Sequence, residues 1–152
     1  MFPRGELITP KGGKWLSFRI GLMLPLVEFW LRRTSFKRCQ RDLARLARWL
    51  PPYAARKISV TEAQALARTV EYGNAHYSIY PADCLTRSLV LQYLLTRRGG
   101  EAQLCLGVRK LTGQFEAHAW VEVEGVPLNE LETVREIYTA LDLTAAKDRA
   151  GA

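Results

Sequence analysis

The sequence predicts one α+β domain in which a cysteine-bearing helix packs on a small antiparallel sheet. Apolar residues recur at helical spacing in the N-terminal two thirds of the chain. They then alternate as in strands between residues 104 and 130, with glycine-containing breaks between the strands. Helices followed by a run of strands are typical of the α+β class. A chain of 152 residues has the length of one domain and can bury a continuous core.

The N-terminal region, residues 1–58, is apolar and strongly basic. Its first 57 residues contain 13 Lys and Arg against three acids, whereas the rest of the chain has nine bases and 12 acids. We expect two helices here, 15–33 and 36–50, ended by Pro51-Pro52. The region either covers the core with a solvated basic face, or it docks a protein partner or an anionic membrane surface.

The composition and motifs exclude several classes of protein. No nucleic-acid recognition motif accompanies the positive charge, so nucleic acid is not an expected partner. The apolar stretch 15–31 is interrupted by Arg19, Pro25 and Glu28, and a transmembrane helix needs about 20 apolar residues. The sequence shows no phosphate-binding loop and no cluster of metal ligands, so we expect neither a cofactor nor a metal.

The N-terminus and the cysteines indicate where the protein works. The first residues lack the apolar core of a signal peptide. The cysteines, Cys39, Cys84 and Cys105, are odd in number and have no paired spacing, which favours a reducing compartment. We therefore expect a cytoplasmic protein, with membrane association through the basic region as a further option.

The second region, residues 59–152, is expected to form the core that carries the chemistry, in one compact unit with the first region. A capping-box pattern that starts at Ser59 opens a helix, which we expect to end at Gly73. A Leu-rich helix then begins at Cys84, directly after Asp83 as its N-cap, and ends before a Gly-Gly pair. This second helix is the one predicted to pack on the sheet.

Three strands follow the Leu-rich helix. The alternation of apolar residues predicts strands over 104–108, 117–123 and 126–130. Breaks at Thr112-Gly113 and Glu124-Gly125 separate them, which makes the sheet antiparallel. We expect a helical tail after the last strand, fraying toward the C-terminus.

Cys84 stands at the first turn of its predicted helix, where a thiol becomes a nucleophile most readily. The helix dipole and the free backbone N–H groups there favour the thiolate, and the same N–H groups can bind an oxyanion. From its position alone, a buried structural thiol is the alternative. Cys105 lies in mid-strand, and Cys39 lies in the basic region without a neighbouring base, so we expect neither to act in chemistry.

His118 is the candidate base. Strand alternation places His118, Trp120 and Glu122 on one face of the strand and apolar residues on the other. A His on the polar face of a strand is most often a surface residue, so the strand by itself does not assign a role. The other histidine, His76, lies in a predicted loop, and we interpret it as structural.

Taken together, these segments resemble a known enzyme superfamily. A Cys at a helix N-terminus, a crossing strand and His-Ala-Trp on the next strand resemble the transglutaminase-like superfamily of papain-type enzymes. More closely, CLTRSLVLQYLLTRRGGEAQLCLGVRK and FEAHAWVEVEGVPLNE are similar to the leader peptidases of lasso-peptide biosynthesis. The likeness covers residues 84–130 closely and the N-terminal region loosely.

The resemblance implies a nucleophile at Cys84 and a base at His118, and we expect Trp120 to contact substrate. It also implies an Asp on the following strand that orients the His, where this sequence has Glu130. The neighbouring Asn129 is the alternative, since papain-like enzymes use an Asn for this purpose.

The register of the last hairpin distinguishes these two residues. A two-residue loop at Glu124-Gly125 would place Trp120 opposite Asn129 and turn Glu130 away from the base. A three-residue loop that includes Val123 would place Glu130 opposite His118 instead. We favour the three-residue loop and therefore Glu130.

The resemblance implies a cysteine peptidase that removes the leader from a ribosomal lasso-precursor peptide. Its expected partners are the precursor peptide, a separate leader-recognition domain protein as in the split form of these enzymes, and a lasso cyclase. Two other functions remain open: transglutaminase- or deamidase-type acyl transfer by the same pair, and a non-catalytic peptide-binding module. The intact Cys84 and His118 favour an enzyme over the binding module.

Overall fold

The computed structural model describes residues 13–51 and 57–141 and confirms the predicted α+β class. Four helices come first: α1 (Gly13–Arg33), α2 (Phe36–Trp49), α3 (Val60–His76) and α4 (Cys84–Thr96). The strands are β1 (Ala102–Leu111), β2 (Gln114–Val123), β3 (Val126–Pro127) and β4 (Thr139–Ala140), with the short helix α5 (Val134–Ile137) before β4. These strands form one antiparallel sheet in the order β3-β2-β1-β4. The expected fraying of the C-terminal residues lies outside the described residues.

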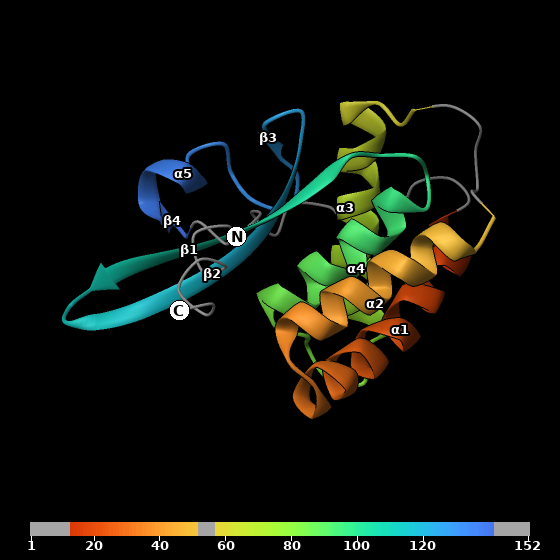
Figure 1. Ribbon diagram of the computed structural model, residues 1–152, viewed down its shortest axis with the longest axis horizontal. Coiled ribbons are helices and arrows are strands. Elements are labelled where there is room, and N and C mark those ends of the chain that lie inside the picture. The colour runs from red at the N-terminus through yellow and green to blue at the C-terminus, as the bar shows by residue number, and fades with distance from the viewer. Residues whose placement is uncertain (1–12, 52–56, 142–152) are drawn as a thin grey trace, which may run out of the picture.

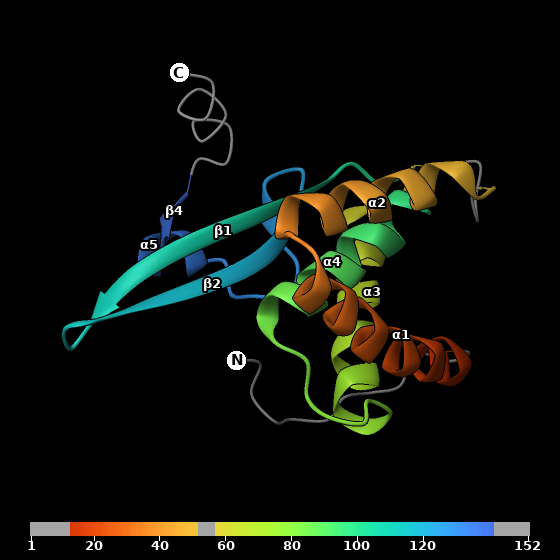
Figure 2. The same ribbon diagram turned by 60° about the horizontal axis from the view of Figure 1, so that its bottom comes forward.

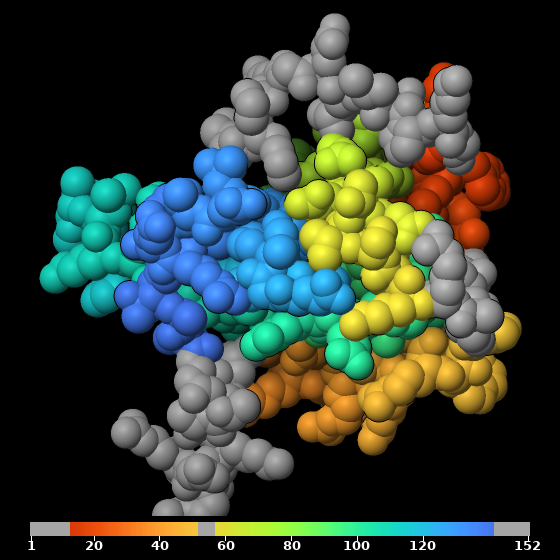
Figure 3. Space-filling view, turned by 90° about the horizontal axis from the view of Figure 1, so that it is seen from above, coloured from red at the N-terminus to blue at the C-terminus, as the bar shows by residue number. Residues whose placement is uncertain are grey.

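Helix α4 is central to the molecule. It packs on β1 and β2 and also contacts α1, α2 and α3, so it joins the sheet to the other helices. The hairpin of β1 and β2 extends away from the helices, as Figures 1 and 2 show. Seen from above, the segment after β2, drawn in blue, lies between this teal hairpin and the yellow helix α3 (Figure 3).

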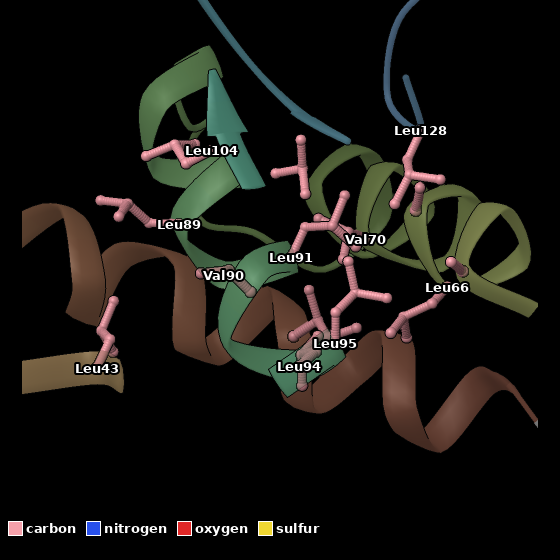
Figure 4. Close-up of a cluster of buried hydrophobic side chains, with 14 of the residues drawn as sticks. Leu43, Leu66, Val70, Leu89, Val90, Leu91, Leu94, Leu95, Leu104 and Leu128 are labelled. Carbon is pink, nitrogen blue, oxygen red and sulfur yellow. The ribbon is translucent and has the colours of Figure 1, made fainter. Parts of the chain in front are cut away.

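One hydrophobic core holds the helices and the near end of the sheet together. It consists of buried residues from α1 to α4, from β1 and β2, and from the chain after β3, and Figure 4 shows part of it. Leu91 and Leu95 of α4 are no more than 1% exposed, and Val121 of β2 is fully buried in the same cluster. Burying one such side chain stabilises the fold by about 1.5–3 kcal/mol. The basic N-terminal helices thus share a core with the rest of the chain.

The helix starts follow the predicted caps. The Ser59 side chain accepts a hydrogen bond from the Glu62 backbone, and the Glu62 carboxylate accepts one from the Ser59 backbone, which completes the capping box of α3. The Asp83 carboxylate accepts from the Thr86 backbone N–H over 2.7 Å and so starts α4 at Cys84. The cap predictions for both helices are confirmed.

The end of α3 differs from the prediction. The helix does not end at Gly73 but continues to His76. A Cβ at Gly73 would lie 2.6 Å from the Ser17 carbonyl oxygen of α1, so the glycine allows α1 and α3 to approach closely. Gly73 therefore serves helix packing rather than helix termination.

The strands also differ from their predicted bounds. β1 and β2 are both longer than expected, and a tight turn at Thr112-Gly113 joins them, as predicted. Both turn residues have positive φ, at 48° and 87°, which is the pattern of a type I′ hairpin turn. β3 is much shorter than the expected 126–130, and up to residue 141, where the described part of the chain ends, the expected helical tail is represented by α5, followed by β4.

The apolar helix α1 does not qualify as a membrane span. Within residues 13–51 and 57–141, every helix is too short or too polar to cross a bilayer. Pro25 lies inside α1, and the helix continues through it.

Candidate active site

Cys84 occupies the first position of α4 and is half-buried. A hydrogen bond with His118 is the main reason that the pKa of the Cys84 thiol lies below its ordinary value. Burial opposes this shift, while a hydrogen bond from the Ala119 backbone and the charge of His118 add to it. The site therefore favours a thiolate at a helix N-terminus, which is the reactive form of cysteine.

His118 lies between Cys84 and an acid. Its Nε2 is 2.8 Å from Oε1 of Glu130, and both side chains are less than one fifth exposed. Because Glu130 occupies Nε2, Nδ1 is the ring nitrogen left to face Cys84. The hydrogen bond with Cys84, followed by that with Glu130, raises the pKa of His118 to about 9. At neutral pH the His118 ring is therefore an imidazolium, and its hydrogen bond and charge favour the thiolate form of Cys84.

The carboxylate of Glu130 completes a line of three groups. Burial raises the pKa of Glu130, whereas the hydrogen bond with His118, the charge of His118 and the charge of Arg87 lower it. The net result is a pKa below the ordinary value, so Glu130 is ionised at neutral pH. An ionised acceptor on Nε2 holds the ring orientation and stabilises its positive charge.

The hairpin register that we expected is wrong, although it led to Glu130. Val123 pairs with Val126, so the loop has only two residues, Glu124 and Gly125, with φ of 53° and 79°. This is a type I′ turn, whose twist suits a two-residue hairpin. β3 ends at Pro127. One further backbone hydrogen bond joins the Leu128 N–H to the Val121 carbonyl, and the chain bends over 128–130, so strand alternation no longer applies at Glu130. The bend, rather than the register, brings Glu130 to His118.

Asn129 does not face the base. It is buried, its Oδ1 accepts from the Val121 backbone over 2.9 Å, and its Nδ2 donates to Oγ of Ser88 over 3.1 Å. The Ser88 hydroxyl in turn donates to the Ala119 carbonyl. Asn129 thus connects α4, which carries the cysteine, with β2, which carries the histidine.

A small cluster supports the histidine from the side of β4. The Tyr138 ring lies 5.1 Å from the His118 ring and packs with Trp120 and Val134. Gly107, the partner of His118 across β1 and β2, makes this possible. A Cβ there would lie 2.8 Å from Cβ of Tyr138 and 2.9 Å from the Trp120 ring.

We expected Trp120 to contact substrate, but the structure buries its side chain. Its side chain is only 1% exposed, so it offers no surface to a substrate in this structure. Its Nε1 donates to Glu122 over 2.7 Å, and Glu122 is also bound by Arg135 of α5. Trp120 therefore helps to hold α5 and Tyr138 on the sheet.

The sequence did not reveal Tyr138 and Arg135 as parts of this environment. They lie in the segment that we expected to be a helical tail, and the signal that could have placed them was a glycine inside a predicted strand, Gly107. The hydroxyl of Tyr138 also donates to Glu116 over 3.2 Å, and Glu116 pairs with Arg109. The two ends of this segment are thus tied to β2 by charged groups.

The remaining thiols and histidine lie apart from this arrangement. Cys39 is fully buried in the large core, and burial raises its pKa. Burial also raises the pKa of Cys105 to about 11. His76 stacks on Tyr72 at the end of α3. Over the two described ranges, no group of three or more His, Cys, Asp or Glu side chains is arranged to hold a metal.

Comparison with known proteins shows the family of the chain. The family model of the transglutaminase-like superfamily matches residues 23–142, which include Cys84, His118 and Glu130. A 61-residue stretch is 41% identical to the microcin J25-processing protein McjB of Escherichia coli. That stretch covers 40% of this chain and 28% of McjB, so the chain matches less than a third of this relative's length. No solved structure matches the chain significantly. Since the family model covers well over half of its residues, the chain belongs to the transglutaminase-like superfamily.

Proposed function

We propose that the protein is a cysteine peptidase that removes the leader from a ribosomal lasso-precursor peptide. The observation that carries the proposal is the Cys84–His118–Glu130 arrangement, with the thiol pKa lowered and the imidazole pKa raised to about 9. The partial identity to a protein that processes microcin J25 supports the class of substrate. We propose the cytoplasm as its compartment.

In the proposed mechanism, the Cys84 thiolate attacks the carbonyl carbon at the junction of leader and core. The carbonyl oxygen becomes an oxyanion, which the free N–H groups at the start of α4 can stabilise. The C–N bond breaks as the His118 imidazolium gives its proton to the leaving amine of the core peptide. The leader remains on Cys84 as a thioester.

Water then completes the cycle. His118, now neutral, takes a proton from the water that attacks the thioester, and the leader leaves with a new carboxylate. Glu130 keeps Nδ1 of His118 directed at the sulfur through both steps and stabilises the imidazolium each time it forms. It acts through the histidine and is a positioning residue.

We propose three partners for this reaction: the precursor peptide, a separate leader-recognition domain protein and a lasso cyclase. The first would be the substrate, the second would deliver the leader to the site, and the third would use the released core. We infer these partners from the proposed substrate class.

The direct test is to incubate the full chain with the precursor peptide, with and without the recognition-domain protein, and to identify products by mass. Cleavage should give a free leader carboxylate and a free core amine. Cys84→Ala should abolish cleavage and leave the fold intact, because the thiol takes part only in chemistry. The matched control is Cys105→Ala, which removes another half-buried thiol and should cleave at close to the wild-type rate. Cleavage by Cys84→Ala at the wild-type rate would refute the mechanism.

A further inference from the structure

Helix α1 has large apolar side chains on two opposite faces. Its inner face contributes Ile20, Leu24 and Val27 to the hydrophobic core, each no more than 3% exposed. Its outer face carries five large apolar residues that are 39–68% exposed. We call them the outer stripe: Trp15, Phe18, Leu22, Leu26 and Phe29.

The outer stripe is continuous along the helix. Its members follow one another in steps of three, four, four and three residues, which places them all on one face of an α-helix. At 1.5 Å per residue the stripe is about 20 Å long. The outer face of a surface helix is normally polar, so an apolar outer face points to a partner that covers it.

The charges around the outer stripe are cationic. Lys14, Arg19, Arg32 and Arg33 belong to the exposed side of α1, and the Arg33 guanidinium lies 4.7 Å from the centre of the Phe29 ring. The one acid of this helix, Glu28, is buried and bound to Arg32 over 2.7 Å. The neighbouring helix α2 exposes five further cations: Lys37, Arg38, Arg41, Arg45 and Arg48. Asp42, the acid of α2, is only half-exposed.

The shape of this surface favours a fluid partner. The five side chains of the outer stripe are exposed, and none of them lines the groove of about 570 Å³ between α2 and α4 or the groove of about 680 Å³ between Trp30 and α2. The lipids of a fluid bilayer can rearrange around exposed side chains, whereas a folded protein partner needs a groove of matching shape. A second copy of the chain would bring two sets of cations together, which electrostatic repulsion opposes.

We propose that the outer stripe of α1 inserts into the headgroup region of an anionic bilayer, with the helix axis in the membrane plane. Apolar burial and the attraction of flanking cations to anionic lipid are the two forces that hold such helices. α1 lies on the side of the helices remote from the β1–β2 hairpin, so the hairpin stays clear of the surface (Figures 1 and 2). The proposal does not depend on the proposed peptidase activity.

The test is co-sedimentation of the full chain with vesicles of phosphatidylcholine alone and with about one third phosphatidylglycerol. We expect binding to the anionic vesicles at low salt, at least fivefold weaker binding at high salt, and little binding to the neutral vesicles. The double variant Leu26→Gln and Phe29→Gln should bind at least fivefold more weakly than the wild type.

The matched control is Phe115→Gln, which removes an apolar side chain that is 77% exposed at the far end of the hairpin and should leave binding unchanged. Alkylation of Cys84 at the wild-type rate shows that each variant is folded. Equal binding by the double variant and the wild type would overturn the proposal. So would a wild-type dimer on gel filtration that the double variant abolishes, or a failure to bind anionic vesicles at low salt.

Discussion

The helical layer and the outer face of the sheet are held together in different ways. Among the described residues, the helices share a core of twenty buried side chains, nearly all aliphatic, to which β2 contributes Val121 and Val123. On the other face of β2, a cluster of only Trp120, Val134 and Tyr138 supports His118. There, charged side chains bind the covering segment to the strand through Glu122 and Glu116.

This difference separates stability from catalysis. Changes in the large core alter how much apolar surface leaves water, and their main effect is on the free energy of unfolding. Changes near His118 alter the orientation and the charge of one ring, and their main effect is on the turnover number. The variants below are ordered by their expected effect on turnover.

Of the variants Glu130→Gln, Gly107→Ala and Leu91→Ala, Glu130→Gln should lower the turnover number most. The amide cannot supply the negative charge that holds the His118 imidazolium, so we expect the turnover number to fall by about 10²–10⁴-fold. Steady-state kinetics of precursor cleavage measure this turnover number. Asn129→Ala should reduce turnover less, because Asn129 contacts Val121 and Ser88 rather than the base. The opposite order would contradict the assignment.

The same variant should also change the pH dependence. The imidazolium must give its proton to the leaving amine, so activity should decline as pH rises through the pKa of His118, which is about 9. Glu130 raises that pKa, so Glu130→Gln should move the alkaline decline to lower pH. An alkaline limb that stays in place would show that Glu130 does not act on His118.

Gly107→Ala should have an intermediate effect. The new methyl group would lie 2.8 Å from Cβ of Tyr138, so β4 or the Tyr138 ring must move away from His118. We expect roughly a tenfold lower turnover and about 1–3 kcal/mol less unfolding free energy. Tyr138→Phe is the companion variant: it keeps the ring and loses only the hydrogen bond to Glu116, so its turnover should stay within about threefold of the wild type. Equal turnover of Gly107→Ala and the wild type would show that this packing does not position the base.

Leu91→Ala should have the smallest effect on turnover. This side chain is 1% exposed in the middle of the large core (Figure 4), and its loss should lower the unfolding free energy by about 2–5 kcal/mol. The turnover number per folded molecule should remain close to wild type at a temperature where the variant is folded. Denaturant unfolding together with active-site titration separates the two quantities. A large loss of turnover per folded molecule would show that the large core affects catalysis as well as stability, contrary to the difference proposed between the two regions.

The sequence predicted well those features that local patterns determine. Apolar periodicity and caps such as Ser59 and Asp83 located the helices, because a helix start needs a partner for its free N–H groups. The same logic placed Cys84 at a helix N-terminus. The resemblance of the surrounding motifs to the transglutaminase-like superfamily indicated His118 as its partner, and the structure brings the two together.

Features that depend on tertiary contacts were predicted less well. Gly73 looked like a helix end, but only the position of α1 shows why a glycine is needed there. The contact of Glu130 with His118 depends on a bend after Pro127 that strand alternation does not contain. Tyr138 reaches the histidine through a segment that we expected to be a helical tail but that forms the short helix α5 followed by β4, so neither its position nor the burial of Trp120 followed from the sequence.

The central claim is that Cys84 and His118 form a thiolate–imidazolium pair, and the pH dependence of Cys84 alkylation tests it most directly. The rate would be measured with iodoacetamide in a background with Cys39→Ala and Cys105→Ala, so that a single thiol reports. We predict that the pKa of this thiol lies below the usual value of about 8.5 and that His118→Ala raises it. A thiol that titrates at or above its usual value, and does so equally with and without the His118 ring, would contradict the account.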